Sequence, residues 1–209
     1  PELIDERIYR YHQLNEQYGG YSKIKEGHRD EIYEYVLDGD SRAQELFGQK
    51  EQQYLDVGDG LIETLDWLQD QGFVLEVVSE MKKTLGAVGS DVVIRFLKTR
   101  GFTKYFPVII NPQGKYDMIE DALVDDRYVG KTKQGGDIYD VLAEDLRSRG
   151  IEPEEAVMVG DKPATDINPA HARGFKTIQY KGFIDLGPSD ADIIINHFSE
   201  LKEVLKKKE

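Results

Sequence analysis

Apolar residues recur at every third or fourth position over residues 3–18, a spacing that predicts a helix with one apolar face. A pair of glycines ends this helix. Two further helices are predicted over residues 30–37 and 41–55, the second directly after Asp40, a residue type that caps helix N-termini. Residues 1–54 are therefore expected to form a small all-helical lobe.

From about residue 55 the pattern changes to short apolar runs that alternate with amphipathic segments. The apolar runs have the length of buried strands and cover residues 73–78, 106–110, 156–159, 175–180 and 192–195. The amphipathic segments predict helices over residues 61–71, 91–99, 137–149, 168–173 and 199–207. This alternation predicts an α/β core over residues 55–209, in which helices cover both faces of a parallel sheet and ligands bind at the carboxyl ends of the strands.

Composition narrows the classes of partner. The formal net charge of -13 argues against nucleic acid or an anionic membrane surface as the principal partner, because both would be repelled. The chain has no apolar run near the roughly 20 residues that span a bilayer, and it has no cysteine, so we expect a soluble, cytoplasmic protein without disulfides or thiolate chemistry. The acidic segment 112–130 is expected to be a solvated loop or hairpin rather than a metal site.

Residues suited to phosphoryl transfer stand where predicted strands end. Ser79 follows the run 73–78, and Asp161 and Asp166 follow the run 156–159, while Lys133 precedes the helix predicted from Asp137. A hydroxyl and a lysine can hold a phosphoryl group, and two carboxylates offer the hard oxygens that Mg²⁺ prefers. Each residue alone is more simply a turn residue, a helix cap or a solvated side chain, so their order and spacing carry the hypothesis.

These residues together resemble the motifs of the haloacid dehalogenase (HAD) superfamily of phosphohydrolases. The Val-Val-Ser sequence ending at Ser79 is similar to its second motif, and the stretch from Lys133 to Tyr139 is similar to a third motif of the form Lys-Pro-x-Pro-x-x-Tyr without either proline. That loss leaves Lys131 as an alternative to Lys133. The Gly-Asp-x-x-x-x-Asp spacing that ends at Asp166 matches the fourth motif. The resemblance implies a three-layer, Rossmann-like parallel sheet with a small helical cap.

The family's first motif, an apolar strand ending in an Asp-x-Asp nucleophile and acid–base pair, has no clean copy here. In one interpretation residues 32–37 form that strand, Asp38 is the nucleophile and Asp40 the general acid and base. In the other, which we favour, residues 1–54 are the helical cap and the motif lies upstream of Pro1. The motif-one strand of this family lies centrally, so its absence would leave unpaired strand edges in the middle of the sheet.

The resemblance implies a Mg²⁺-dependent phosphohydrolase that acts on a small phosphorylated metabolite through an aspartyl-phosphate. Ser79 and Lys133 would hold the phosphoryl group, and Asp161 and Asp166 would hold the metal ion. The alternative is a catalytically inactive relative that serves as a phosphate-binding or protein-interaction module, because motifs one and three are degenerate. The substrate and the oligomeric state are not encoded in any pattern that we can interpret.

Overall fold

The computed structural model describes residues 2–18, 28–43, 57–79, 92–182 and 185–206. The chain divides into two compact units, the first made of Pro1–Asp56 with Lys83–Arg95 and the second of Val57–Lys82 with Phe96–Glu209. Within the described residues, no helix has the length and apolar content needed to cross a membrane.

The first unit is helical in its described residues. It contains α1 (Glu2–Tyr18), the short α3 (Arg29–Glu31) and the π-helical turn η1 (Ile32–Val36). Apolar side chains of α1, η1 and the residues that follow form a core of their own, made of Leu14, Ile32, Val36, Leu37 and Ala43. The apolar positions at every third or fourth residue of α1 thus form one helix face, which packs against η1 as the sequence predicts.

The interpretation of residues 32–37 as a strand is wrong. Leu37 donates its amide to the carbonyl of Ile32 at 3.1 Å, a bond of the helical type, and residues 41–43 continue as a helix. Ile32 and Val36 lie about one helical turn apart, so both side chains are on the same face of η1. Both are buried in the cluster that contains Leu14 of α1. The remainder of the helix predicted over 41–55 lies outside the described residues.

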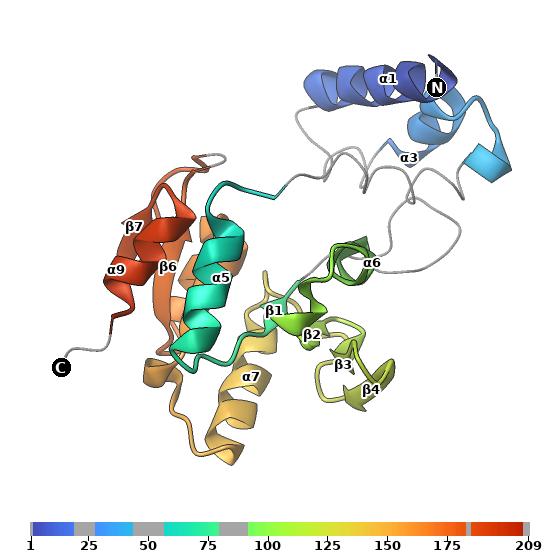
Figure 1. Cartoon of the computed structure of the whole chain (residues 1–209). Coiled ribbons are helices and arrows are strands. Elements are labelled where there is room, and N and C mark those ends of the chain that lie inside the picture. Colours follow the sequence, from blue (N-terminus) through green and yellow to red (C-terminus); the bar gives the residue numbers. More distant parts are fainter. Residues whose placement is uncertain (1, 19–27, 44–56, 80–91, 183–184, 207–209) are drawn as a thin grey trace. The chain divides into compact units, whose positions relative to one another are not determined.

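The second unit carries all the described strands, in two sheets (Figure 1). The first has the order β1-β2-β3-β4 and the second the order β5-β6-β7. The strands are β1 (Val77–Val78), β2 (Val108–Asn111), β3 (Gly114–Asp117), β4 (Ala122–Asp125), β5 (Val157–Gly160), β6 (Lys176–Tyr180) and β7 (Ile193–Ile195). β1 runs parallel to β2, and the whole second sheet is parallel, which confirms the α/β fold that the sequence predicts.

The first sheet is mixed rather than purely parallel. β2, β3 and β4 pair antiparallel, because the two residues between β2 and β3 form a tight turn and a connection so short can only join antiparallel strands. The acidic segment 112–130 is therefore a hairpin, one of the two forms expected. Gly114, with φ near 129°, lies so close to β4 that a Cβ atom there would overlap Leu123.

Helices accompany the strands at nearly the predicted places. They are α5 (Leu61–Asp70), α6 (Val92–Thr99), η2 (Phe102–Lys104), α7 (Asp137–Ser148), η3 (Pro153–Glu155), η4 (Pro163–Ile167), α8 (Asn168–His171), η5 (Phe198–Glu200) and α9 (Leu201–Val204). The boundary between the two units falls within α6. The strand predicted over 73–78 shortens to β1, because only Val77 and Val78 pair with β2.

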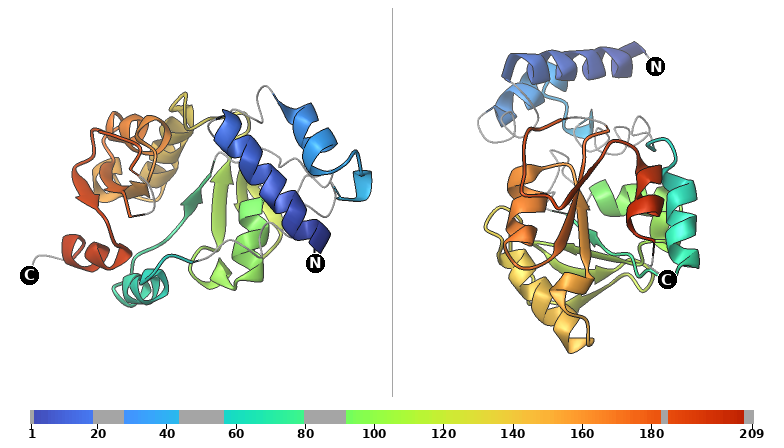
Figure 2. Two further views of the ribbon diagram at one scale, coloured as in Figure 1. Left: turned by 90° about the horizontal axis from the view of Figure 1, so that it is seen from above. Right: turned by 90° about the vertical axis from the view of Figure 1, so that its left-hand side faces the viewer.

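Successive residues of β5 face two different helices. Met158 packs against the cluster built on α7, whereas Val157 and Val159 pack against the cluster that contains Leu201 of α9. Alternate side chains of a strand point to opposite faces of its sheet, so this sheet is covered on both faces, as a parallel sheet requires. The views in Figure 2 show the α7 and α9 segments beside this sheet.

Candidate functional site

The predicted phosphate and metal residues meet at the carboxyl ends of β1 and β5. Ser79 directly follows β1 and is buried, and its amide donates to the carbonyl of Ile110 in β2 at 2.9 Å. Asp161 directly follows β5, and Asp166 lies in the π-helical turn η4 that comes next. All these residues belong to the second unit, so one folded body positions them.

Lys133 joins the ends of the two strands. Its ammonium donates to the carbonyl of Val78 at 3.1 Å and forms an ion pair with the carboxylate of Asp166 at 2.5 Å. The lysine is only 8% exposed. Lys131, the alternative left open by the sequence, instead lies 3.8 Å from Asp137 at the start of α7. The geometry therefore places Lys133, and not Lys131, among the candidate site residues.

Asp166 is held ionised by its surroundings. The residue is 5% exposed, and besides pairing with Lys133 its carboxylate accepts hydrogen bonds from the amide of Lys162 at 3.2 Å and the hydroxyl of Thr165 at 3.1 Å. Burial by itself would raise the pKa of this carboxyl, but the charge and hydrogen bond of Lys133 outweigh it and lower the pKa below its ordinary value.

Asp161 has the opposite electrostatic environment. Burial raises the pKa of its carboxyl, and the neighbouring charge of Asp166 raises it further. Among the described residues, no Lys or Arg side chain forms an ion pair with Asp161. A carboxyl that lies beside a second carboxyl without a cation of its own is suited to receive a bound cation.

The glycine before Asp161 has a steric reason. A Cβ atom on Gly160 would lie 2.4 Å from the Cβ of Asp166, well inside van der Waals contact. The chain therefore needs glycine there for η4 to fold back over the end of β5. This close approach is a steric reason for the glycine that precedes Asp161.

The donor set fits Mg²⁺ in chemistry and in number. In the described part of the chain no three His, Asp or Glu residues gather as a metal site, so a metal ion held at Asp161 and Asp166 would need further ligands from water or substrate. Mg²⁺ usually keeps several waters and binds through one or two carboxylates together with substrate phosphate. Two carboxylates at a strand end match that requirement, and the oxygens of Asp166 already accept from Lys133 and Thr165 on one side and from the amide of Lys162 on the other.

Asp38 and Asp40 lie in the first unit, and neither follows a strand. Asp38 has a left-handed backbone (φ 53°) and pairs with Arg10 at 2.6 Å; that hydrogen bond lowers the pKa of its carboxyl. Asp40 caps the helix at residues 41–43 by accepting from the amides of Arg42 and Ala43, and the amide of Ala43 is the main cause of its lowered pKa. Capping is the simpler role that the sequence also allowed for Asp40.

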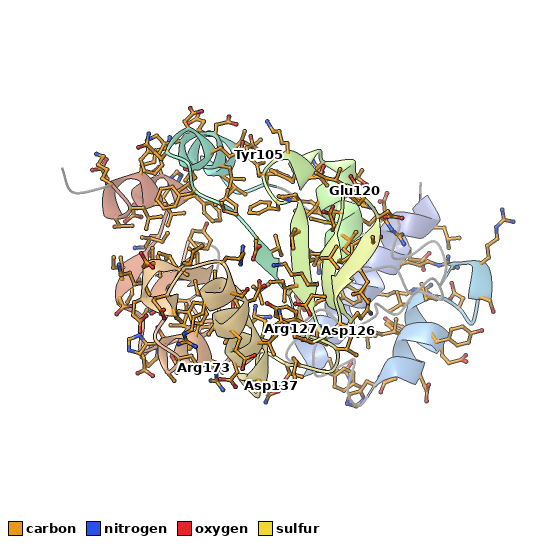
Figure 3. The ribbon with its side chains drawn as sticks, turned by 90° about the horizontal axis from the view of Figure 1, so that it is seen from below. Tyr105, Glu120, Asp126, Arg127, Asp137 and Arg173 are labelled. Carbon is orange, nitrogen blue, oxygen red and sulfur yellow. The ribbon has the colours of Figure 1, made fainter. Side chains whose placement is uncertain are left out.

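Two supports of the site carried no assigned role in the sequence. Tyr139, fully buried on α7, donates its hydroxyl to the carbonyl of Thr165 at 2.9 Å and so fixes the turn that bears Asp166. Arg173 pairs with Asp140 at 2.7 Å and packs over Gly136, which ends the Lys133 loop; Figure 3 shows Arg173 near Asp137. The likeness to the third motif, which ends at Tyr139, was the sequence signal for the first residue, and nothing in the pattern indicates the second.

Comparisons with known proteins agree with this arrangement. A family model described as HAD-hydrolase-like matches residues 130–184, the segment that contains Lys133, Asp161 and Asp166. A comparison with curated proteins gives no match. Among solved structures, a HAD phosphatase from Thermococcus onnurineus is 26% identical with a TM-score of 0.62, over 98% of this chain and 87% of that one.

Two other structures share the fold. A protein from Listeria monocytogenes serotype 4b is 22% identical with a TM-score of 0.53, over 71% of this chain and 79% of that one. YfnB from Bacillus subtilis, in a structure bound to magnesium, is 20% identical with a TM-score of 0.59, over 96% of this chain and 83% of that one. The fold, the segment matched by the family model and these likenesses agree, so the chain resembles HAD-superfamily hydrolases in its fold and in the sequence of residues 130–184.

Proposed function

We propose that this protein is a Mg²⁺-dependent phosphohydrolase that acts on a small phosphorylated metabolite. The observation that carries the proposal is the position of Lys133, a buried cation at the carboxyl ends of β1 and β5, between Val78 and Asp166. A fixed positive charge at this point would neutralise charge on a transferring phosphoryl group without the cost of reorganising solvent.

Each residue of the site has a proposed task. Ser79 and Lys133 hold the phosphoryl oxygens, and Asp166 keeps the ammonium of Lys133 in place through their ion pair. Asp161 and Asp166 are the ligands proposed for the metal ion. When bound, Mg²⁺ supplies charge neutralisation and orientation of the phosphoryl group. The magnesium in the YfnB structure supports this choice of metal by likeness of fold.

Asp38 and Asp40 are the candidates that the sequence offers for the attacking carboxylate and its acid–base partner. Asp38 and Asp40 have the Asp-x-Asp spacing, but Asp40 is engaged as a helix cap and the pKa of its carboxyl is lowered, which disfavours it as a general acid near neutral pH. We therefore propose that Asp38 and Asp40 stabilise the first unit, as part of a cap, and do not form the aspartyl-phosphate.

A second function is favoured by a specific observation. Among the described strands, β1 and β5 are each at the edge of a sheet, so no strand of the described chain brings an acidic residue between Ser79 and Asp161. A chain that holds phosphate there without an attacking carboxylate would be a phosphate-binding module and not a phosphatase.

Hydrolysis of p-nitrophenyl phosphate with Mg²⁺ tests the proposal. We expect turnover to fall about 100-fold or more in Asp161→Asn, because the loss of one preorganised electrostatic contact at a reacting group has an effect of about that size. In Asp38→Asn turnover should change less than about twofold, because Asp38 is not proposed to be part of the site. Asp185→Asn is the matched control, because Asp185 is an exposed aspartate whose carboxylate pairs with Lys181.

Calorimetric titration with orthovanadate, a phosphate mimic, separates the two functions. Vanadate binding that needs Lys133 but comes without turnover would favour the binding module. Loss of turnover in Asp38→Asn would restore Asp38 as the nucleophile. If the protein shows no vanadate binding and no turnover, both functions are refuted.

A further inference from the structure

The guanidinium group of Arg173 connects α7 and α8. Its Nε and Nη2 atoms donate to the two carboxylate oxygens of Asp140 on α7, at 2.7 and 3.0 Å. Its remaining nitrogen, Nη1, donates to the carbonyl of Pro169 in α8 at 3.0 Å. All the nitrogens of the group are therefore engaged, and a bidentate pair of this kind fixes the plane of the guanidinium as well as its place.

The same guanidinium covers the backbone of Gly136. A Cβ atom on Gly136 would lie well inside van der Waals contact of the Nη1, Cζ and Nη2 atoms of Arg173. Gly136 is buried, whereas Gln134 and Gly135 just before it are exposed. Its φ of 77° is also one that favours glycine. The loop that follows Lys133 thus ends at a residue on which the flat face of Arg173 can rest directly.

Both contacts lie three residues after a residue of the candidate site. Gly136 donates its amide to the carbonyl of Lys133 at 3.1 Å, which closes a turn between the two. Pro169 lies in the first turn of α8, three residues after Asp166. Arg173 therefore links the two segments that bring Lys133 and Asp166 together as an ion pair.

A second link joins the same two parts of the chain in the core. The buried Tyr139 of α7 donates its hydroxyl to the carbonyl of Thr165 at 2.9 Å. The side chain of Arg173 is 24% exposed, so its link lies nearer the surface. One link alone would let the segments turn about it, whereas two links restrict that rotation. A partly exposed ion pair adds little to stability, so the main effect expected of Arg173 is on orientation.

We propose that Arg173 is a positioning residue for the phosphoryl-transfer site. It clamps Gly136 and Pro169 so that the ammonium of Lys133 stays where it meets Val78 and Asp166. The effect on catalysis rests on the proposed function, because it needs Lys133 to hold the phosphoryl group. The clamp on the loop does not rest on that function.

Steady-state hydrolysis of p-nitrophenyl phosphate tests the effect on catalysis. In Arg173→Met we expect kcat to fall about tenfold with KM changed less than about twofold, because a small displacement of a catalytic contact costs rate. The urea midpoint of unfolding should change little. Arg173→Lys keeps the charge but loses the bidentate geometry, so it should restore little of the lost rate. The matched control is Arg147→Met, since Arg147 lies on α7 and pairs with Glu152 at 3.1 Å; it should leave kcat unchanged.

Gly136→Ala tests the clamp from its other side. The added methyl group displaces the guanidinium while Arg173 itself remains in the chain. If the methyl group acts through Arg173, Gly136→Ala combined with Arg173→Met should lower kcat no further than the more affected single variant does. Effects that multiply would show that the two residues act independently, and would overturn the proposal.

Backbone amide exchange of Gly136, measured by NMR on the full chain, tests the clamp without reference to turnover. Exchange should become about tenfold faster in Arg173→Met and stay unchanged in Arg147→Met, because the turn that closes on Lys133 loosens. Faster exchange in a chain that shows no turnover would refute the phosphatase and keep the clamp. An unchanged kcat in Arg173→Met, or full recovery of kcat in Arg173→Lys, would overturn the positioning role and keep the phosphatase.

Discussion

At the scale of single residues, the Lys133–Asp166 ion pair is the most consequential contact of the second unit. The two side chains are 10% and 7% exposed, so each would be a buried, uncompensated charge without the other. Removal of one partner of a buried pair typically costs about 3–5 kcal/mol, whereas removal of both is often nearly neutral. The pair thus links stability and the proposed catalysis, and a double-variant cycle can separate them.

We predict that Lys133→Met lowers the free energy of unfolding by about 3 kcal/mol and lowers p-nitrophenyl phosphate turnover at least about 100-fold. Combining it with Asp166→Asn should recover most of the stability but none of the activity. Lys131→Met is the matched control and should change both by little, because Lys131 is partly exposed and its contact with Asp137 is long, at 3.8 Å. Recovery of activity in the double variant would show that Lys133 is merely structural.

At the scale of elements, residue pattern predicted which segments are helix and strand better than how they pair. The runs at 156–159 and 175–180 became β5 and β6 within one residue, and the two strands pair in parallel along their length. The run at 73–78 gave only β1, since strand length depends on a neighbour that periodicity cannot reveal. At the site, residue order located Ser79, Asp161 and Asp166, but the choice of Lys133 over Lys131 depended on a tertiary contact with β1.

Ion pairs connect the hairpin β3–β4 to α7 through Lys115, which is buried. Lys115 of β3 pairs with Asp145 of α7 at 2.8 Å and with Glu76 at 3.3 Å, and Arg149 pairs with both of these acids. Figure 3 shows Arg127, which also reaches Asp145, beside the hairpin. The charge of Lys115 is thereby compensated where the hairpin meets α7, while Glu120, Asp121 and Asp126 of the hairpin segment are exposed.

We predict that Lys115→Met lowers the free energy of unfolding by about 3 kcal/mol, because it leaves the buried carboxylate of Asp145 without its closest cation. The matched control is Lys104→Met. Lys104 lies 3.8 Å from Asp66 and is 63% exposed, so its loss should cost less than about 1 kcal/mol. Urea unfolding followed by the fluorescence of Trp67, the single tryptophan of the chain, reports on this unit. Equal losses in both variants would contradict the network's role.

At the scale of the whole molecule, acidity controls stability through a few carboxyls with shifted pKa values. The formal net charge is -13 at pH 7 and approaches zero near pH 4.8, where the protein is least soluble. The net charge does not identify the residues whose protonation unfolds the chain. The carboxyls of Asp140 and Asp166 have lowered pKa values, while that of Asp161 is raised. Their exposures differ, so their contributions to stability should differ as well.

We predict that stability falls as the pH drops below about 4, and that Asp166 is the largest single cause. A carboxyl with a lowered folded pKa contributes stability above its unfolded pKa and loses it as the pH falls through the folded value. Asp161 acts in the opposite sense, because its raised pKa costs stability as the pH rises above the unfolded value. Urea unfolding of dilute protein at pH 7, 5, 4 and 3.5, read by Trp67 fluorescence, measures the net slope.

The comparison that decides this prediction is between two variants. Replacing Lys133 and Asp166 together by Met and Asn should flatten the loss between pH 5 and 3.5, because the buried titrating group and its cation are both gone. Asp140→Asn should leave the curve within about 0.5 kcal/mol of the parent, since Asp140 is 56% exposed and solvent screens its pair with Arg173. If instead Asp140→Asn flattens the curve and the double variant does not, surface pairs and not the buried site govern acid unfolding of this protein.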